Sequence, residues 1–242
     1  MPMLIAGLTL AAGIGATISG VVGMAGGTFL LAMMIVLGVS APVLIPLHAA
    51  VQLASNCTRV YAHREHIRWR PFLTLALVAT PCPIVGLQIA AWIDFELTKQ
   101  LMGVIILYAA WAPKRSAAAL PETASFTIAG LLGGTLGVVV GAVGPLIAPF
   151  FLRPDMNKTN IIATKALCQA YLHIIKIVAF STVGFVFAEQ WQKFLPMAAA
   201  TIVGTYIGKW LLQHLKENRF RLLYKVILSA LALRLILGGF FS

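Results

Sequence analysis

Two sets of polar residues recur at helical spacing within apolar stretches of this sequence. Each set follows the order i, i+4, i+8, i+11, so its members share one face of a helix. The two sets are His48, Gln52, Asn56 and Arg59, and Lys165, Gln169, His173 and Lys176. Their side chains are hydrogen-bond donors, and two such faces would line a path for an anion. A simpler alternative is that the amides bond to neighbouring helices while Arg59 and Lys165 reach the membrane interface.

Glycines cluster upstream of each polar set. The first cluster is Gly23, Gly26 and Gly27, and the second is Gly141, Gly144 and Pro145. Glycine permits close backbone approach and proline ends a helix, so a break here would expose N–H groups that favour anions. A break at membrane depth is tolerated where it lines a cavity or binds a ligand. The alternative is helix packing, because Gly23–Gly27, Gly137–Gly141 and Gly204–Gly208 all have GxxxG spacing.

The acidic residues indicate the sign of the charge that these faces would bind. All seven lie in or beside connections between apolar segments: Glu65, Asp94, Glu96, Glu122, Asp155, Glu189 and Glu217. A cation site in a membrane needs carboxylates or carbonyl groups at that depth. A chain that keeps only cationic and neutral polar groups inside is suited to an anion. His48 and His173 could carry protons or serve only as neutral hydrogen-bond donors.

Most of the chain has the composition of membrane helix. Of 242 residues, 60% are hydrophobic and 10% are charged, whereas a soluble domain has about 25% charged residues. At about 20 apolar residues per crossing, we expect an all-α polytopic membrane protein with about eight to ten transmembrane segments. The net charge of +11 comes from basic clusters in short connections, which is typical of cytoplasmic loops and not of nucleic-acid binding.

An internal duplication is indicated by matched positions in the two halves. Residues 21–27 align with 139–145, and the polar sets align at identical spacing. Trp69 and Gly86 match Trp191 and Gly208, and the offset rises from 117 to 122. We expect a first repeat over 1–112, a cytoplasmic linker over 113–123 and a second repeat over 124–242.

The two repeats are expected to have opposite orientations. The connection at 63–70 is basic and is expected inside, whereas 93–98 carries Asp94 and Glu96 and is expected outside. The second half reverses this order. Segments 3–38 and 124–152 would then each begin and end on one face, as a Gly-broken hairpin or re-entrant pair. Inverted repeats with broken helices are the architecture of many secondary transporters.

Catalytic and metal-binding patterns are not apparent in the sequence. Cys57, Cys82 and Cys168 lie in apolar stretches without paired spacing, so they indicate neither a disulfide nor a zinc framework. There is no nucleophile–base pair and no metal-ligand spacing. We therefore expect a protein that is not an enzyme and that needs no metal or cofactor.

Several motifs resemble the TauE/SafE sulfite exporters, also called the four-toluene sulfonate uptake permease family. The likeness covers essentially the whole chain. It is carried by GVVGMAGGTFLL at 20–31, LGVS at 37–40, PLHAA at 46–50, IRWR at 67–70, and the repeated patterns at 137–145 and 220–223. The resemblance implies a multi-pass protein of the bacterial plasma (inner) membrane. It also implies a small sulfur-containing anion as substrate, such as sulfite, thiosulfate or an organosulfonate.

Together these features predict a secondary transporter in which one repeat rocks against the other around a central site. Its substrate-binding residues would be Gly23, Gly26, Gly27, His48, Gln52, Asn56, Gly141, Gly144, Lys165, Gln169 and His173. Arg59 and Lys176 would attract the anion along its path. The alternatives are an uncoupled anion pore and a membrane scaffold whose glycines only pack helices. The particular anion, the direction of transport, the coupling ion and the oligomeric state, a homodimer included, stay open.

Overall fold

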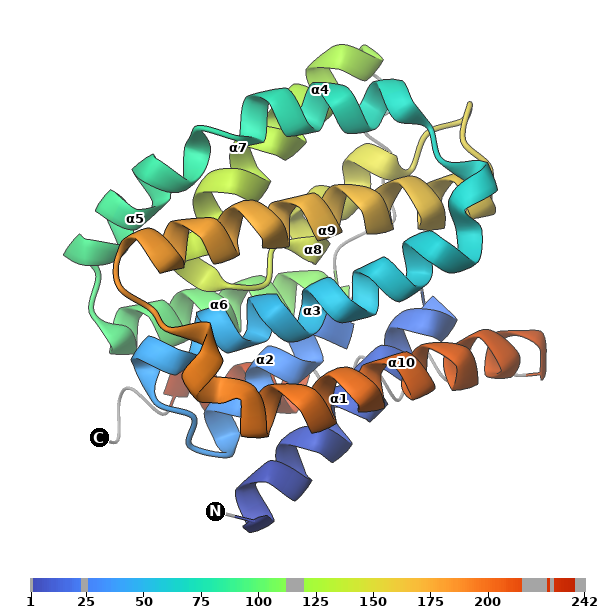
Figure 1. Cartoon of the computed structure of the whole chain (residues 1–242). Coiled ribbons are helices and arrows are strands. Elements are labelled where there is room, and N and C mark those ends of the chain that lie inside the picture. Colours follow the sequence, from blue (N-terminus) through green and yellow to red (C-terminus); the bar gives the residue numbers. More distant parts are fainter. Residues whose placement is uncertain (1, 23–25, 112–119, 215–225, 227–228, 238–242) are drawn as a thin grey trace.

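The computed structural model describes residues 2–22, 26–111, 120–214, 226 and 229–237. Within these ranges all regular secondary structure is helical (Figure 1). The elements are α1 (Pro2–Val22), α2 (Gly26–Val36), α3 (Ala41–His63), η1 (Arg64–His66), α4 (Trp69–Ala79), α5 (Cys82–Trp92), α6 (Phe95–Trp111), α7 (Glu122–Val140), α8 (Gly144–Ile147), η2 (Ala148–Phe151), α9 (Lys158–Thr182), η3 (Phe187–Gln190) and α10 (Trp191–His214). Residues 229–237 are also helical. Most of the expected linker over 113–123 lies outside the described residues.

Three described helices are long and apolar enough to cross a membrane. They lie at Pro2–Gly20, Glu122–Val140 and Thr159–Thr182, and the bent pair α4 and α5, at 50°, would be a fourth. This is fewer than the eight to ten crossings expected from composition. The helix α2 is only 11 residues long, and the polar set on α3 lowers its hydropathy. The larger number of crossings stays a prediction.

The first Gly-broken segment reverses direction between α1 and α2. The Gly26 N–H donates to Ser19 Oγ over 3.1 Å. At the other end of α2, a Cβ added to Gly7 would lie 3.3 Å from the side chain of Leu37. The helix α2 therefore runs back along α1. Gly23, expected at this break, lies outside the described residues.

The second Gly-broken segment reverses in the same way. The helix α7 ends at Val140, and its cap residue Gly141 has φ 75° and ψ −58°, a positive-φ conformation that glycine adopts without a Cβ clash. Beyond it the chain returns along α7. The rings of Phe126 and Phe151 lie 5.0 Å apart, and Arg153 Nη1 donates to Ser125 Oγ over 3.3 Å.

Each hairpin packs against helices from the other half of the sequence. On one side, a Cβ added to Gly20 of α1 would lie 2.8 Å from Gly208 Cα of α10. On the other side, a Cβ added to Gly130 of α7 would lie 2.8 Å from the Leu75 carbonyl oxygen of α4. Packing through small residues therefore accounts for Gly208, as its GxxxG spacing suggested, and also for Gly20 and Gly130.

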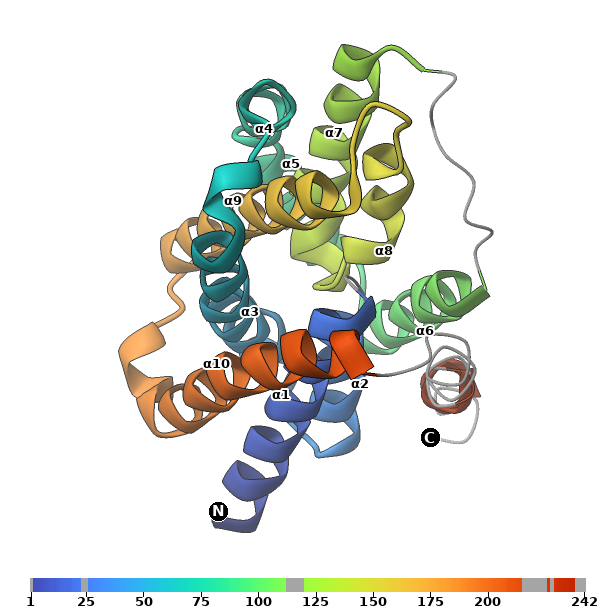
Figure 2. The same cartoon turned by 90° about the vertical axis from the view of Figure 1, so that its right-hand side faces the viewer.

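The helices α3 and α9 lie side by side in the middle of the molecule, as Figure 1 shows, and are packed along their length. In Figure 2, α1, α2 and α10 lie to one side of this pair, and α4, α5, α7 and α8 lie to the other. We call α1, α2, α3 and α10 the first body, and α4, α5, α7, α8 and α9 the second body. The interface between the bodies brings the two polar sets together.

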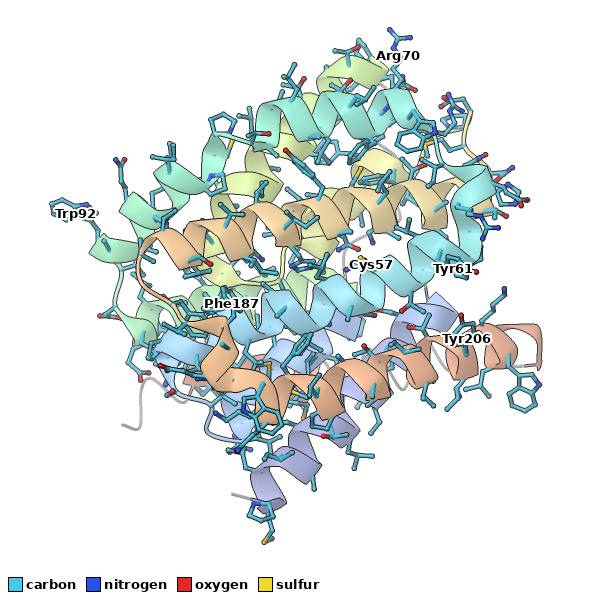
Figure 3. All side chains as sticks on the ribbon, viewed as in Figure 1. Cys57, Tyr61, Arg70, Trp92, Phe187 and Tyr206 are labelled. Carbon is cyan, nitrogen blue, oxygen red and sulfur yellow. The ribbon has the colours of Figure 1, made fainter. Side chains whose placement is uncertain are left out.

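The two ends of the molecule differ in their surface residues. Arg68 pairs with Glu122 at 3.6 Å and with Asp155 at 3.4 Å, so both ends of the α7 hairpin meet the basic connection 63–70. Figure 3 shows Arg70 near this end and Trp92 projecting from the opposite end.

All five tryptophans are at least 57% exposed and lie at or near helix ends: Trp69, Trp92, Trp111, Trp191 and Trp210. Tryptophan at helix ends is typical of membrane interfaces.

Candidate functional site

A cavity lies where the two hairpin turns meet the polar faces of α3 and α9. Eight of the residues expected at the site line it: Gly27, His48, Gln52, Arg59, Gly144, Gln169, His173 and Lys176. Its unfilled volume, mouth included, is about 470 Å³. The expected residues Gly26, Gly141, Asn56 and Lys165 are buried but do not line it. The residues that line the cavity come from both halves of the chain.

Ser19 and Thr28 also line the cavity, and the sequence analysis did not select them. Thr28 directly follows the first glycine cluster, and Ser19 faces that cluster across the α1–α2 hairpin. A small hydroxyl residue next to a helix break was the available signal. Thr28 is 2% exposed and Ser19 is 5% exposed. Each hydroxyl adds a donor and an acceptor to the cavity.

Each hairpin turn places a glycine against a glutamine. A Cβ added to Gly27 would lie 3.1 Å from Gln52 Cδ, and a Cβ added to Gly144 would lie 2.6 Å from Gln169 Nε2. The two pairs share an offset of 117 residues. By these contacts, Gly144 is the counterpart of Gly27. The sequence alignment instead paired Gly144 with Gly26, so the two correspondences differ by one residue. The missing side chains leave room for both amides at the cavity.

The two histidines meet across the interface between the bodies. Their rings lie 6.0 Å apart at an interplanar angle of 71°. His48 Nε2 lies 2.9 Å from the Gly27 carbonyl oxygen, and since a carbonyl only accepts, Nε2 is the donor. This hydrogen bond fixes the ring of His48 to the start of α2.

Lys176 connects α9 to the end of α7. Its side chain is 2% exposed, and Nζ donates to the Gly141 carbonyl oxygen over 2.6 Å. The last carbonyls of a helix are left without intrahelical partners and carry partial negative charge, so a cation is favoured there. Lys176 thus stabilises the second hairpin turn as well as adding positive charge to the cavity.

Asn56 serves mainly to position its neighbours. Its Nδ2 donates to the Gln52 carbonyl oxygen over 2.8 Å, and its Oδ1 accepts from Arg59 Nη2 over 2.7 Å. This arrangement holds the guanidinium at the cavity. Lys165, on the facing helix, is 3% exposed, and its Nζ has no hydrogen-bond partner among the described residues.

The charged side chains that line the cavity, Arg59 and Lys176, are both cationic. Arg59, Lys165 and Lys176 are all at most 7% exposed. Within the described ranges, none of them forms an ion pair with a carboxylate, because the acids that do pair bond to cations at the ends of the molecule. The described part of the chain also holds no group of three or more His, Cys, Asp or Glu side chains placed for a metal ion. The arrangement can bind an anion through side-chain donors.

Apolar helices of membrane-spanning length are typical of a multi-pass membrane protein, and here they surround a buried cavity lined by cations. The chain matches the family model for the sulfite exporter TauE/SafE over residues 8–235, and it belongs to that family. The resemblance noted in the sequence is therefore confirmed. Because this is a family of transporters, the expectation that the chain is not an enzyme is confirmed as well.

One curated relative carries a functional description. It is a probable sulfite/organosulfonate exporter TauE from Cupriavidus necator, 28% identical over 141 residues. The match covers 53% of this chain and 55% of the relative, so it spans about half the length of each. No solved structure matches the chain.

Proposed function

We propose that this protein is a secondary transporter of a small sulfur-containing anion, namely sulfite, thiosulfate or an organosulfonate, in the bacterial plasma membrane. The observation that carries the proposal is the buried cavity, which has donors from both halves of the chain and no described carboxylate at its cations. The name of the Cupriavidus necator relative supports the same substrate class.

The anion would bind between the two glutamines. Taking an anion out of water is costly unless donors replace its hydration shell. The Nε2 groups of Gln52 and Gln169 can donate to its oxygens, and the glycines beside them allow close approach. Lys176 and Arg59 supply positive charge at the cavity wall. A sulfite or sulfonate group presents three oxygens to these donors.

Alternating access would move the first body against the second, a division that differs from the two halves of the sequence. Glycine contacts hold α10 to α1 and α4 to α7. The hydrogen bonds from His48 to Gly27 and from Lys176 to Gly141 join α3 and α9 to their own hairpins. The α3–α9 interface, where the cavity lies, is then the surface that opens to either side of the membrane.

The test is anion flux in proteoliposomes that contain the purified chain. Replacing both Gln52 and Gln169 with Leu removes the two amides at nearly constant volume, and we expect flux of sulfite or organosulfonate to fall at least tenfold. Gln88→Leu is the matched control, because Gln88 is exposed on α5. Unchanged flux in a correctly inserted double variant would contradict the proposed site.

Trans-stimulation separates the proposed carrier from the alternatives. A carrier exchanges faster when the same anion is present on the opposite side, and its rate saturates. Flux without saturation or trans-stimulation would favour an anion pore. Absence of both flux and anion binding would favour a membrane scaffold.

A further inference from the structure

Arg59 and Lys165 form a pair of buried cations at the end of the α3–α9 interface nearest the connection 63–70. Arg59 is 7% exposed and Lys165 is 3% exposed. They lie on the facing helices α3 and α9, between the contact of His48 with His173 and the hydrogen bond from Asn160 Nδ2 to the His66 carbonyl oxygen. Two like charges held together away from water need a compensating group.

Both side chains retain donors that no described residue uses. Arg59 Nη2 donates to Asn56 Oδ1 over 2.7 Å, but Arg59 Nε is buried without a partner. Lys165 Nζ is also buried without a partner among the described residues. Lys176, by contrast, gives its ammonium to the Gly141 carbonyl oxygen. The buried cationic donors that lack a described partner therefore lie at one end of the site.

No described acidic residue neutralises this pair. Those that form ion pairs do so with other cations: Glu122 with Arg68 and Arg70, Asp155 with Arg68 and Arg153, and Glu96 with Lys99. A buried donor without an acceptor is unfavourable, and more so when it is charged. A bound anion would satisfy both the unused hydrogen bonds and the charge.

We propose that Arg59 and Lys165 form an oxyanion-binding subsite next to the central cavity, which determines selectivity for oxyanions over halides. This proposal rests on the proposed transport function. Arg59 lines the cavity, and Lys165, one helical turn from the lining residue Gln169, does not, so the subsite lies at the edge of the cavity nearest the connection 63–70. Guanidinium N–H groups suit two-point recognition of an oxyanion. With the lysine ammonium they can hold two oxygens of one sulfite or sulfonate group, whereas chloride offers a single acceptor centre.

The test measures the KM for sulfite flux and the inhibition constant of chloride in proteoliposomes. The variants are Arg59→Met, Lys165→Met and the double variant. Lys193→Met is the control, because the Lys193 ammonium bonds to Gln190 away from the cavity. We expect each single variant to raise the KM for sulfite at least tenfold while the inhibition constant of chloride changes less than threefold. The double variant should raise the KM by clearly less than the product of the two single effects, because both donors hold the same anion.

Conservative variants distinguish binding from folding. Lys165→Arg keeps the charge and the donors, and we expect its KM to stay within about threefold of the parent chain. Arg59→Lys keeps the charge but loses the two-point geometry, so its KM should lie between those of the parent chain and Arg59→Met. If a methionine variant does not insert, Lys165→Gln, which is neutral but polar, replaces it. An unchanged KM in the neutral variants, multiplicative effects in the double variant, or equal losses for sulfite and chloride would overturn the subsite. Absence of sulfur-anion flux in the parent chain would instead overturn the proposed function.

Discussion

Lys176 donates a hydrogen bond to the carbonyl oxygen of Gly141 over 2.6 Å, which joins the middle of α9 to the residue that caps α7. Gly141 has a positive φ and begins the turn that reverses the second hairpin. One buried ammonium therefore stabilises the hairpin turn and contributes charge to the cavity. On α3, His48 makes the comparable contact with Gly27 of the first hairpin.

Replacing Lys176 with Met should lower both stability and transport. Interhelical hydrogen bonds in membranes contribute about 0.6–2 kcal/mol, so we expect a lower unfolding temperature of the purified chain and at least a tenfold loss of anion flux. Lys193→Met is the control, because the Lys193 ammonium bonds to Gln190 away from the cavity. Flux equal to that of the control would show that the contact is not needed for transport.

Replacing Gly144 with Ala should weaken anion binding while leaving the fold intact. The new Cβ would lie 2.6 Å from Gln169 Nε2, and the amide can rotate away because it ends a flexible side chain. We expect about a tenfold rise in the Kd, or roughly 1.4 kcal/mol, in calorimetric titration with sulfite. Gly184→Asn is the control, since its turn is open and asparagine tolerates a positive φ. An unchanged Kd would place Gln169 outside the binding site.

Replacing Gly208 with Leu should destabilise the first body. A Cβ at this position would lie 2.9 Å from Gly20 Cα, and backbone atoms cannot move aside as a side chain can. Overpacking costs about 1–3 kcal/mol, so we expect a lower unfolding temperature and a lower yield of monodisperse protein. Gly7→Ala should be mild, because its neighbour is the end of the Leu37 side chain. Equal stability of the two variants would contradict tight α1–α10 packing.

Cysteine labelling should place Arg70 and Trp92 on opposite faces of the membrane. The Arg70 side chain is 81% exposed and Trp92 is 91% exposed, and they lie at opposite ends of the molecule (Figure 3). In a background without the native cysteines, an impermeant maleimide should label Trp92→Cys in intact cells. It should label Arg70→Cys only after the membrane is opened, because basic connections stay inside. The reverse pattern would invert the proposed orientation.

The sequence by itself predicted the helical membrane class, the anion-compatible charge and the two polar faces. These properties follow from composition and from the period of the α-helix, which are local. Six of the eight residues in the polar sets line the cavity, because residues on one helical face stay together wherever that face packs. The family was likewise recognisable from motifs that are continuous along the chain, and the family comparison confirmed it.

Only the tertiary structure decided which groups meet. The α1–α2 hairpin packs against α10, and α7 packs against α4 and α5, so each hairpin contacts helices from the other half of the chain. This packing depends on glycine contacts between residues far apart in the sequence, and periodicity carries no information about such pairs. By their spacing in the sequence, Lys165 and Lys176 are equivalent members of one polar set. The fold ties the Lys176 ammonium to a helix end and leaves that of Lys165 unpaired, because the position of a neighbouring backbone carbonyl, and not the spacing of the residues, determines which donor is satisfied.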